Sequence, residues 1–197
     1  MKLLVFSDIH GDLAALERLL AIEADYYIAA GDLANFAKGL DKAAAVLASR
    51  KDRVWLLPGN HEHETATSAL CAEHGFGDLH RNSFEAEGWH VAGLGHSNPT
   101  PFDTPGESPE SELAERLEPF ATLDPLILVC HCPPKGCALD EAGPGLHFGS
   151  TAIASFIERV QPEWFFCGHI HEAAGRKATF GRTIGINAGK KGWLLEV

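Results

Sequence analysis

The sequence predicts an α/β protein, built as a sandwich that contains both parallel and antiparallel β-strands. In the first half, short apolar runs alternate with helical patterns, an order that is typical of parallel βαβ units. Towards the C-terminus helices become scarce, and hairpin-like spacing around residues 189–192 indicates antiparallel strands. The length of 197 residues and the 45% hydrophobic content suit a sizeable core, so we expect residues 1–197 to form a single domain.

The first predicted strand, residues 3–6, is followed by two polar side chains of ligand type. The run Leu-Leu-Val-Phe has the composition of a strand covered on both faces, and Asp8 and His10 come soon after it. Open α/β sheets place their chemistry at the carboxyl ends of strands, so both side chains are candidates. Residues 12–23 have leucines at helical spacing and are predicted to form a helix, with Asp12 near its positive N-terminal end.

The same order of strand, ligand and helix follows twice more. Predicted strands at 26–30 and 53–57 are each followed by a predicted helix, at 38–50 and at 65–74. The polar residues between these strands and helices include Asp32, Asn60, His61 and Glu62. We therefore expect the second and third strands to deliver further ligands to the same edge of the sheet.

The second half contains longer connections. Residues 95–109 are predicted to form a surface loop. Residues 132–148 are predicted to form a Pro- and Gly-rich connection, and its length indicates a segment that is either functional or disordered. The predicted helices and their N-caps are 111–117 with Ser111 and 151–160 with Ser150. The predicted strands are 89–94, 126–130, 164–167, 183–187 and 193–197. The histidines at the ends of these strands are His131, His169 and His171.

The composition argues against several classes of protein. The formal net charge of -11 is unfavourable for a broad nucleic-acid-binding surface. No stretch of about 18 apolar residues is present, and the first strand follows Met1 without the layout of a signal peptide, so we expect a cytoplasmic protein with no membrane segment. Five cysteines at uneven spacing argue against a disulfide framework.

Seven side chains at the strand ends could together bind metal ions. A single histidine at a strand end is weak evidence, because such residues are more often ordinary surface or hydrogen-bonded groups. The oxygen and nitrogen donors of the combined set are Asp8, His10, Asp32, Asn60, His131, His169 and His171. One ion needs about four to six ligands, so two ions are the more economical interpretation.

The order of these motifs resembles that of the calcineurin-like metallophosphoesterase family. Asp-x-His, Gly-Asp, Gly-Asn-His-Glu, a single His after a strand, and Gly-His-x-His occur in this order across residues 8–171. The match covers nearly the whole chain and indicates a small, cap-free member of the bacterial and archaeal phosphodiesterase-like type. The resemblance implies a four-layer α/β/β/α sandwich of two mixed β-sheets flanked by helices.

The resemblance also implies how the ligands divide between two ions and which residues take part in catalysis. One ion would take Asp8, His10 and His171; the other would take Asn60, His131 and His169; Asp32 would bridge both. His61 would contact the phosphate and protonate the leaving oxygen, a task for a side chain that titrates near neutral pH. The alternative is that His61 only orients a neighbour. The expected catalytic residues are therefore His61, Asp32 and Asn60.

Two adjacent divalent cations explain these residue types. A bridging carboxylate offers one oxygen to each cation, which Asp32 can do and an asparagine does poorly. Ions about 3.5 to 4 Å apart clamp the attacking and leaving oxygens of an in-line displacement and lower the pKa of a shared water, so the expected nucleophile is a metal-bridging hydroxide. The mixed ligand set suits Mn, Fe, Ni, Co or Zn, among which we favour Mn.

Two segments depart from the commoner forms of the family. Residues 187–190 read Asn-Ala-Gly-Lys where many members have Asn-Pro-Gly-Ser, which leaves the role of this loop open. The Gly-Asp motif at Asp32 is followed by Leu-Ala-Asn and lacks the Asp-Arg-Gly of the protein phosphatase branch, so that branch is disfavoured.

Other side chains have weaker claims to a role. A zinc site at Cys130, Cys132 and Cys137 is disfavoured because the spacing matches no paired Cys-x-x-Cys pattern. The residues that could line the pocket or contact substrate are His63, His147, Lys135, Lys190, Lys191, Asn35 and Phe36. The histidines that lack a partner pattern, and are treated as ordinary, are His74, His80, His90 and His96.

We therefore expect a dinuclear metal-dependent phosphoesterase that acts on small phosphate esters. Phosphodiesters of nucleotide type are placed ahead of phosphomonoesters, because a compact chain without a cap suits small substrates. One alternative is a protein-binding scaffold of the same fold without significant catalysis. A weaker alternative is a DNA nuclease, which the net charge of -11 disfavours. Homo-oligomerisation stays open.

Overall fold

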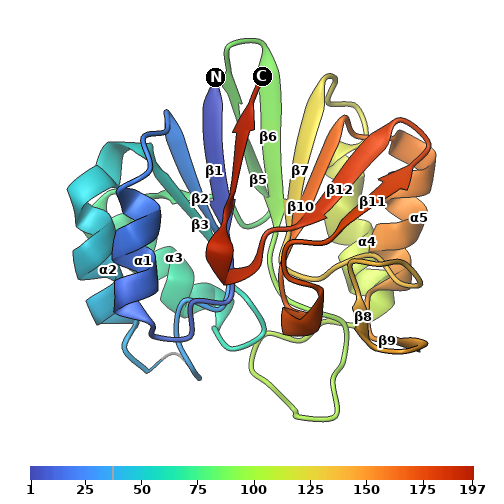
Figure 1. Ribbon diagram of the computed structural model, residues 1–197, viewed down its shortest axis with the longest axis horizontal. Coiled ribbons are helices and arrows are strands. Elements are labelled where there is room, and N and C mark those ends of the chain that lie inside the picture. The colour runs from blue at the N-terminus through green and yellow to red at the C-terminus, as the bar shows by residue number, and fades with distance from the viewer. Residues whose placement is uncertain (37) are drawn as a thin grey trace.

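The computed structural model describes residues 1–36 and 38–197, and two large β-sheets pack face to face in it (Figure 1). Helices cover the outer face of each sheet, on the left and on the right in Figure 1. The predicted four-layer α/β/β/α sandwich of two mixed sheets is therefore confirmed. The carboxyl ends of the parallel strands lie at one edge of the sandwich, at the bottom in Figure 1, where their loops come together.

The first sheet has the strand order β13-β1-β2-β3-β4. Its strands are β1 (Lys2–Phe6), β2 (Tyr26–Ala30), β3 (Val54–Leu57), β4 (Gly77–Asp78) and β13 (Trp193–Glu196). Only β13 runs antiparallel to its neighbour. The helices that pack on this sheet are α1 (Leu13–Leu20), α2 (Leu40–Leu47) and α3 (Glu64–His74).

The second sheet has the order β11-β12-β10-β7-β6-β5. Its strands are β5 (Asn82–Ala86), β6 (Trp89–Leu94), β7 (Leu126–Cys130), β10 (Trp164–Cys167), β11 (Lys177–Phe180) and β12 (Thr183–Asn187). The two edge strands, β5 and β11, are antiparallel to their neighbours, and the inner pairs are parallel. The outer face carries α4 (Glu110–Leu117) and α5 (Thr151–Val160), and a short hairpin of β8 (Glu141–Gly143) and β9 (Leu146–His147) lies beside the carboxyl edge.

The side chains of β1 point alternately to the two faces of the sheet, and both faces are buried. Leu4 and Phe6 pack in the layer beneath the first set of helices, whereas Leu3 and Val5 pack between the two sheets. Successive side chains of a strand point to opposite faces, so a strand covered on both sides needs apolar residues throughout. The rigid, buried strand fixes the position of the polar residues that follow it.

Hydrogen bonds from capping side chains define where two of the helices begin. The carboxylate of Asp12 accepts from the backbone N–H of Ala15 at 3.0 Å, and the hydroxyl of Ser150 accepts from that of Ile153 at 3.2 Å. These contacts agree with the predicted starts of α1 and α5. Among the described residues, no helix has both the length and the apolar character that crossing a bilayer requires.

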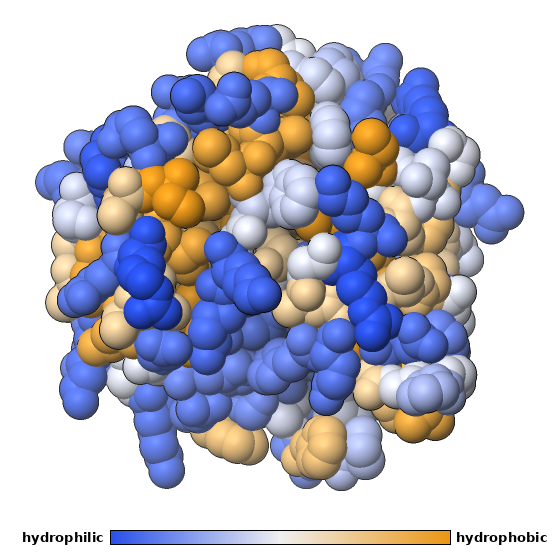
Figure 2. Space-filling view, in the orientation of Figure 1, coloured by the Kyte–Doolittle hydropathy of each residue, from blue (hydrophilic) through white to orange (hydrophobic). Residues whose placement is uncertain are grey.

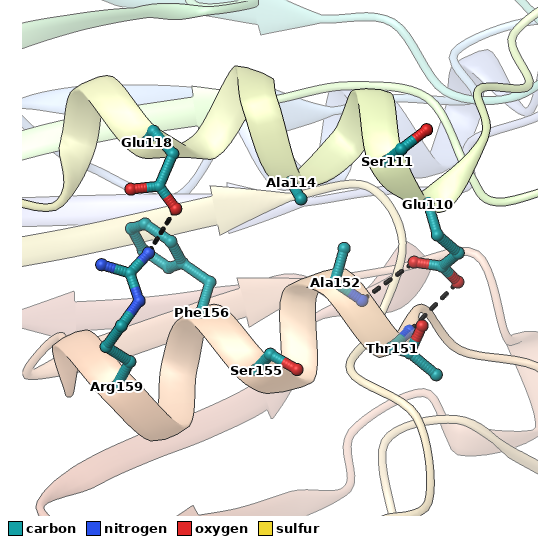
Figure 3. A pocket seen from close by; sticks show the side chains of 9 residues that line it. All are labelled: Glu110, Ser111, Ala114, Glu118, Thr151, Ala152, Ser155, Phe156 and Arg159. Atoms are coloured by element: carbon teal, nitrogen blue, oxygen red, sulfur yellow. Dashed lines mark hydrogen bonds and ion pairs between the residues drawn. The ribbon is translucent and has the colours of Figure 1, made fainter.

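The prediction that Ser111 caps a helix is wrong. Helix α4 begins at Glu110, its N-cap is Pro109, and no side chain caps it. The carboxylate of Glu110 instead accepts hydrogen bonds from the backbone N–H groups of Thr151 and Ala152, at 3.1 and 2.9 Å (Figure 3). The first N–H groups of a helix have no partner within the helix, and a negative charge is favoured beside them. Glu110, at the start of α4, therefore stabilises the N-terminus of the neighbouring helix α5.

The hairpin-like interpretation of residues 189–192 is also wrong. This segment is the 3-10 turn Gly189–Lys191, and it carries the chain from β12 in the second sheet to β13 in the first. Strand β12 pairs antiparallel with β11, and β13 pairs antiparallel with β1, but β12 and β13 do not pair with each other. The second predicted helix, 38–50, is shorter than expected, because α2 ends at Leu47 and a kinked 3-10 segment, Ala48–Arg53, replaces its last turn.

Candidate metal centre

Polar side chains from both sheets converge at the carboxyl edge. The residues that follow β1, β2, β3, β7 and β10 there are Asp8, His10, Asp32, Asn60, His131, His169 and His171. Four of these residues have left-handed backbone, with φ values of 59° at Asp8, 49° at His10, 54° at Asp32 and 67° at His169. Non-glycine residues adopt this conformation rarely, and such strain is concentrated at functional sites.

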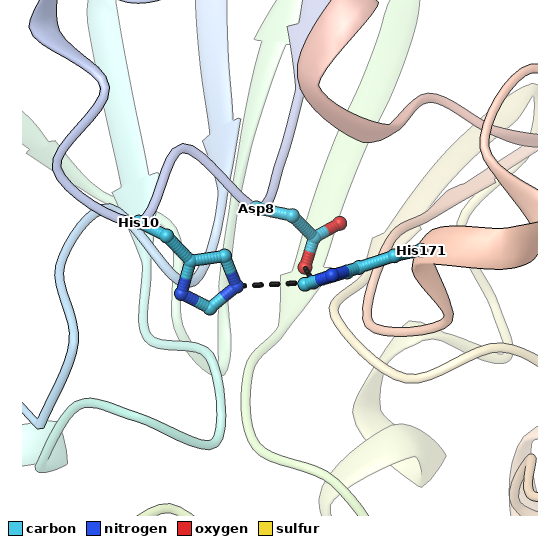
Figure 4. Close-up of side chains that lie close together, drawn as sticks. All are labelled: Asp8, His10 and His171. Atoms are coloured by element: carbon cyan, nitrogen blue, oxygen red, sulfur yellow. Dashed lines mark hydrogen bonds and ion pairs between the residues drawn. The ribbon is translucent and has the colours of Figure 1, made fainter.

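Asp8, His10 and His171 form the first group of donors (Figure 4). Nε2 of His10 lies 3.0 Å from Nε2 of His171, which in turn lies 3.6 Å from Oδ1 of Asp8. One potential ligand atom of each residue lies within 4.8 Å of the other two. Since Asp8 and His10 follow a strand of the first sheet and His171 follows a strand of the second, the group spans the two sheets.

Asn60, His131 and His169 form the second group. Oδ1 of Asn60 lies 3.0 Å from Nε2 of His131 and 2.9 Å from Nδ1 of His169. His131 is fully buried, and Asn60 is 4% exposed. A carbonyl-type oxygen and two ring nitrogens that point at one another are a ligand set suited to a borderline divalent cation.

Asp32 lies between the two groups. Its Oδ2 atom is 3.6 Å from Nε2 of His10, in the first group, and 3.5 Å from Nε2 of His131, in the second. Its other oxygen, Oδ1, accepts a hydrogen bond of 2.9 Å from the backbone N–H of His61, which fixes the carboxylate. One oxygen therefore faces both groups, which differs from the expected arrangement with one carboxylate oxygen for each ion.

Hydrogen bonds on the far side of two rings determine which nitrogen faces the centre. Nδ1 of His131 donates to the carbonyl of Ala30 at 2.8 Å, and Nδ1 of His10 donates to Oδ1 of Asn35 at 2.8 Å. In the neutral rings the lone pairs of Nε2 therefore point inward. Nε2 of His131 then faces Oδ1 of Asn60 and Oδ2 of Asp32, neither of which donates a hydrogen. Lone pairs that point at one another repel unless a cation lies between them, so the donor set fits a metal ion.

The electrostatics of the donor side chains agree with this requirement. Burial alone would lower the pKa of His131, but the adjacent carboxylate of Asp32 raises it to about 9. Burial also opposes ionisation of Asp32, yet the charge of His131 holds the pKa of that carboxyl well below its usual range. Burial, followed by the charge of His131, lowers the pKa of His169 to about 4. A proton is thus favoured on His131, beside the carboxylate of Asp32, and disfavoured on the neighbouring His169.

His61 belongs to neither of these two groups, but one potential ligand atom of its ring lies within 4.8 Å of ligand atoms of both His10 and Asp32. Its ring packs edge-on against the ring of His10, with centroids 5.1 Å apart, and against that of Phe36 at 4.8 Å. Its Nδ1 atom is buried and has no hydrogen-bond partner among the described residues. Buried polar atoms are paired in most proteins, so an unpaired one beside a candidate metal centre points to a functional role for the ring.

Glu62 is a functional residue for which the sequence interpretation gave no role. Its carboxylate accepts from three backbone N–H groups, those of Asp32 at 2.8 Å, Gly59 at 2.7 Å and Ala34 at 3.0 Å. Burial, followed by the charge of Asp32, raises the pKa of Glu62 to about 7. The side chain holds together the two loops that carry Asp32 and Asn60. In the sequence, only its position in the Gly-Asn-His-Glu motif indicated that Glu62 has a role.

Thr104 and Glu107 determine which way the amide of Asn60 points. Nδ2 of Asn60 donates to Oγ1 of Thr104 at 3.1 Å, and the Thr104 hydroxyl donates to the carboxylate of Glu107 at 2.6 Å. Burial opposes ionisation of Glu107, but hydrogen bonds from Thr100 and Thr104 lower its pKa below the usual value. An ionised carboxylate only accepts, so the hydroxyl hydrogen points away from Asn60 and Oδ1 of Asn60 must face the histidines. No sequence signal identified this pair.

Two glycines allow the loops to approach the ligands. A Cβ atom on Gly59 would lie 1.9 Å from Oδ1 of Asp32, and one on Gly168 would lie 2.5 Å from Oδ2 of Asp8. No side chain fits at either position without displacing a candidate ligand. The loop around Asn187, whose role the sequence left open, is a brace: Nδ2 of Asn187 lies 3.1 Å from the carbonyl of Gly168 and 3.0 Å from that of Ile170.

The weaker candidates lie in varied surroundings. Asn35 holds the ring and backbone of His10. His63 is exposed at the start of α3, and Lys190 pairs with Asp12 at 3.6 Å. His147 donates to the buried carboxylate of Asp140 at 2.8 Å and, like Lys135, lines a cavity beside the centre. None of the metal-compatible groups found in 1–36 and 38–197 includes a cysteine.

A third group, Glu64, His80 and His96, was not anticipated from sequence. Nδ1 of His80 accepts from the backbone N–H of Gly95 at 3.0 Å, and Nδ1 of His96 faces the guanidinium of Arg116 at 3.4 Å. In both neutral rings the hydrogen is therefore on Nε2. In His80 this atom lies 3.2 Å from Oε2 of Glu64, and in His96 it has no partner among the described residues. Such rings do not offer a lone pair to a metal ion, so we assign this group to structure.

Comparison with known proteins agrees with the geometry. A family model described as calcineurin-like phosphoesterase matches residues 1–173. The uncharacterized protein MJ1162 of Methanocaldococcus jannaschii is 31% identical over 202 residues, which cover 99% of this chain and 91% of that protein.

Two solved structures share the fold at low sequence identity. The protein TT1561 of Thermus thermophilus has a TM-score of 0.73 at 20% identity, covering 96% of this chain and 90% of that one. The phosphopantetheinyl hydrolase PptH of Mycobacterium tuberculosis has a TM-score of 0.67 at 18% identity, covering 95% and 88%.

Proposed function

Because the chain belongs to the calcineurin-like phosphoesterase family, we propose that it hydrolyses small phosphate esters with the help of two divalent metal ions. The observation that carries the proposal is the position of Asp32, which shares one carboxylate oxygen between two separate groups of ligand atoms. A site for a single ion would need only one of these two groups of ligand atoms. The proposal treats residues 1–197 as one catalytic domain of a cytoplasmic enzyme.

The seven donors divide into two ligand sets. The first ion would be held by Asp8, His10 and His171, the second by Asn60, His131 and His169, and both by Asp32. When bound, such ions activate water as the nucleophile and stabilise the negative charge that develops on the phosphoryl oxygens. We favour Mn for both positions, although four imidazoles, two carboxylates and one amide without a thiolate are equally compatible with Fe, Ni, Co or Zn.

His61 is the proposed general acid. Its ring nitrogen Nδ1 has no partner in the described part of the chain, and the ring is held beside His10 and Phe36. The backbone N–H of His61 donates to Oδ1 of Asp32, so the residue starts from a fixed position beside the carboxylate that would bridge the ions. A proton given to the departing oxygen is worth about 10²- to 10⁴-fold in rate.

Small phosphodiesters are the proposed substrates, with phosphomonoesters second. The net charge of -11 disfavours a long polyanion as substrate. One structural neighbour is named as a hydrolase of a phosphopantetheinyl group, a small organic phosphate, which supports this size of substrate.

The test is hydrolysis of nitrophenyl phosphate mono- and diesters by protein freed of metal and then reloaded with Mn, Fe, Ni, Co or Zn. We expect turnover only after reloading, and faster turnover of the diester. His61→Ala should retain two ions per chain while kcat falls at least about 100-fold. His63→Ala, which changes an exposed histidine two residues away, is the matched control and should keep wild-type kcat.

Absence of turnover with every metal would contradict the proposal and favour a protein-binding scaffold. Unchanged kcat in His61→Ala would remove this residue from the mechanism while leaving the metal centre in place.

A further inference from the structure

Exposed phenyl rings gather around the candidate metal centre. In the described ranges, the phenylalanines classed as exposed are Phe36 at 56%, Phe102 at 76% and Phe148 at 50%. They lie on the loops that follow β2, β6 and β9, all at the carboxyl edge, where Figure 2 shows apolar residues among polar ones at the bottom of the molecule. Large apolar side chains that remain in water at one place mark a binding surface.

Two of these rings line a cavity that is continuous with the centre. The cavity has a volume of about 510 Å³, and its walls include Phe102, Phe148 and two of the candidate metal ligands, His169 and His171. This volume lies within the range of about 300–1,000 Å³ that is usual for small-molecule sites. A group attached to a phosphate at the metal centre can therefore enter the cavity directly.

The polar groups of the cavity suit an anionic organic ligand. Lys135 is exposed on its wall, and no carboxylate of the described residues lies within ion-pair distance of its ammonium group. The ring of His147 is oriented by the buried carboxylate of Asp140, at 2.8 Å from Nδ1, so its other nitrogen is free to accept from a ligand hydroxyl or amino group. The wall also carries one acidic residue, Glu172, next to the metal-ligand candidate His171.

Building on the proposed function, we propose that this cavity binds one organic arm of the substrate and that this arm carries a flat aromatic ring, as a nucleotide does. Phe102 and Phe148 supply ring faces and edges for stacking, and Lys135 attracts the phosphate that the arm is attached to. The third ring, Phe36, lies against His61 on the side of the first sheet, outside this cavity. An aliphatic arm would gain contact with the phenyl rings but no stacking.

The test is calorimetric binding of three phosphonates to metal-loaded protein: benzylphosphonate, hexylphosphonate and methylphosphonate. Their carbon–phosphorus bonds resist hydrolysis, so binding is measured without turnover. We expect benzylphosphonate to bind at least about tenfold more tightly than methylphosphonate and more tightly than hexylphosphonate, in line with ring-stacking energies.

Three variants separate the contributions. Phe102→Leu combined with Phe148→Leu keeps an apolar wall without rings and should remove the preference for benzylphosphonate over hexylphosphonate. Lys135→Gln should weaken all three ligands alike, because all carry the same phosphonate. Ile22→Ala, which changes an exposed apolar residue just beyond the C-terminal end of α1, is the control and should change nothing.

Equal affinity for benzylphosphonate and hexylphosphonate in the wild type, or a preference that survives in the double variant, would overturn the assignment of the cavity. Either result would leave the proposed function intact if nitrophenyl esters are hydrolysed. Ring-dependent binding without hydrolysis of any ester would support the cavity and contradict the proposed function.

Discussion

The side chain of Asn60 has one oxygen and one nitrogen at its end, and only the oxygen can serve as a metal ligand. Which atom faces the histidines depends on Thr104, whose hydroxyl accepts from the amide nitrogen at 3.1 Å. Thr104 can accept in this geometry because its own hydrogen is directed to Glu107. The chain of hydrogen bonds is thus part of the metal centre, although neither Thr104 nor Glu107 touches the ligand positions of the first group.

Thr104→Val removes the hydroxyl and retains the shape, so the amide of Asn60 loses its anchor. We expect the affinity of the second metal position to fall about 10-fold or more, as is usual when a partner of a metal ligand is removed. Thr104→Ser keeps the hydroxyl and should bind within about threefold of wild type. Equilibrium dialysis with Mn distinguishes these outcomes; equal losses in both variants would show that the methyl group, and not the hydrogen bond, matters.

All seven candidate ligands could be proposed from sequence because each follows a recognisable apolar run in a known order. Thr104, Glu107 and Asn35 could not be given their roles, because each acts on a metal-ligand candidate more than about 20 residues away and belongs to a segment with no periodic pattern. Glu62 lay within a motif, but only the fold shows that its carboxylate joins two neighbouring turns. The identity of the ligands can therefore be predicted from short motifs, whereas their orientation depends on residues that are distant in the sequence.

The turns after β2 and β3 illustrate how the strand ends are assembled. These strands are parallel neighbours, so the loops that follow them lie side by side. The loops pack backbone to side chain, since a Cβ on Gly59 would lie 1.9 Å from the Asp32 carboxylate. The position of the bridging carboxylate therefore depends on the absence of a side chain in the neighbouring turn.

Gly59→Ala should displace Asp32 and weaken binding of both ions, because Asp32 contacts both groups. Overpacking of this kind also costs about 1–3 kcal/mol in the free energy of unfolding. Gly143→Ala, where the nearest atom to the new Cβ is 3.4 Å away, is the matched control. Metal content and thermal unfolding of both variants check the prediction; two tightly bound ions in Gly59→Ala would contradict it.

The elements predicted most accurately were the buried strands and the helices α3, α4 and α5, whereas the helix predicted at residues 12–23 already ends at Leu20. The short strands β4, β5 and β11 were not predicted, because they are short or half exposed and lack a continuous apolar run. The connection at residues 189–192 was misinterpreted because a turn signal does not show whether the next strand pairs with the previous one. Here β13 crosses to the other sheet, and only long-range pairing with β1 reveals it.

Across the whole molecule, the group of Glu64, His80, His96 and Arg116 connects the two halves of the sandwich. Glu64 lies on α3, over the first sheet, and Arg116 lies on α4, over the second, with 3.7 Å between the charged atoms. His80 and His96 fill the space between them, with ring centroids 5.0 Å apart. Burial, followed by the charges of His80 and Arg116, lowers the pKa of His96 to about 4.

This group predicts a loss of stability in acid. An unfolded His96 takes up a proton near pH 6.5, whereas the folded one does so only near pH 4, so its contribution is complete above pH 6.5 and is lost as the pH falls to 4. The loss amounts to at most about 3 kcal/mol in the free energy of unfolding. We expect the free energy of unfolding to fall less steeply between pH 6.5 and 4 in His96→Gln than in wild type. The control His63→Gln should fall as steeply as wild type. Urea unfolding at several pH values measures these slopes, and a wild-type slope in His96→Gln would contradict the prediction.

The account as a whole rests on two ions that share Asp32. Crystals of the protein equilibrated with Mn and measured by anomalous diffraction test this directly, because each ion gives its own peak. We predict two peaks in contact with the Asp32 carboxylate, one beside His10 and His171 and the other beside Asn60 and His131. A single peak, or two peaks that do not share Asp32, would contradict the central claim.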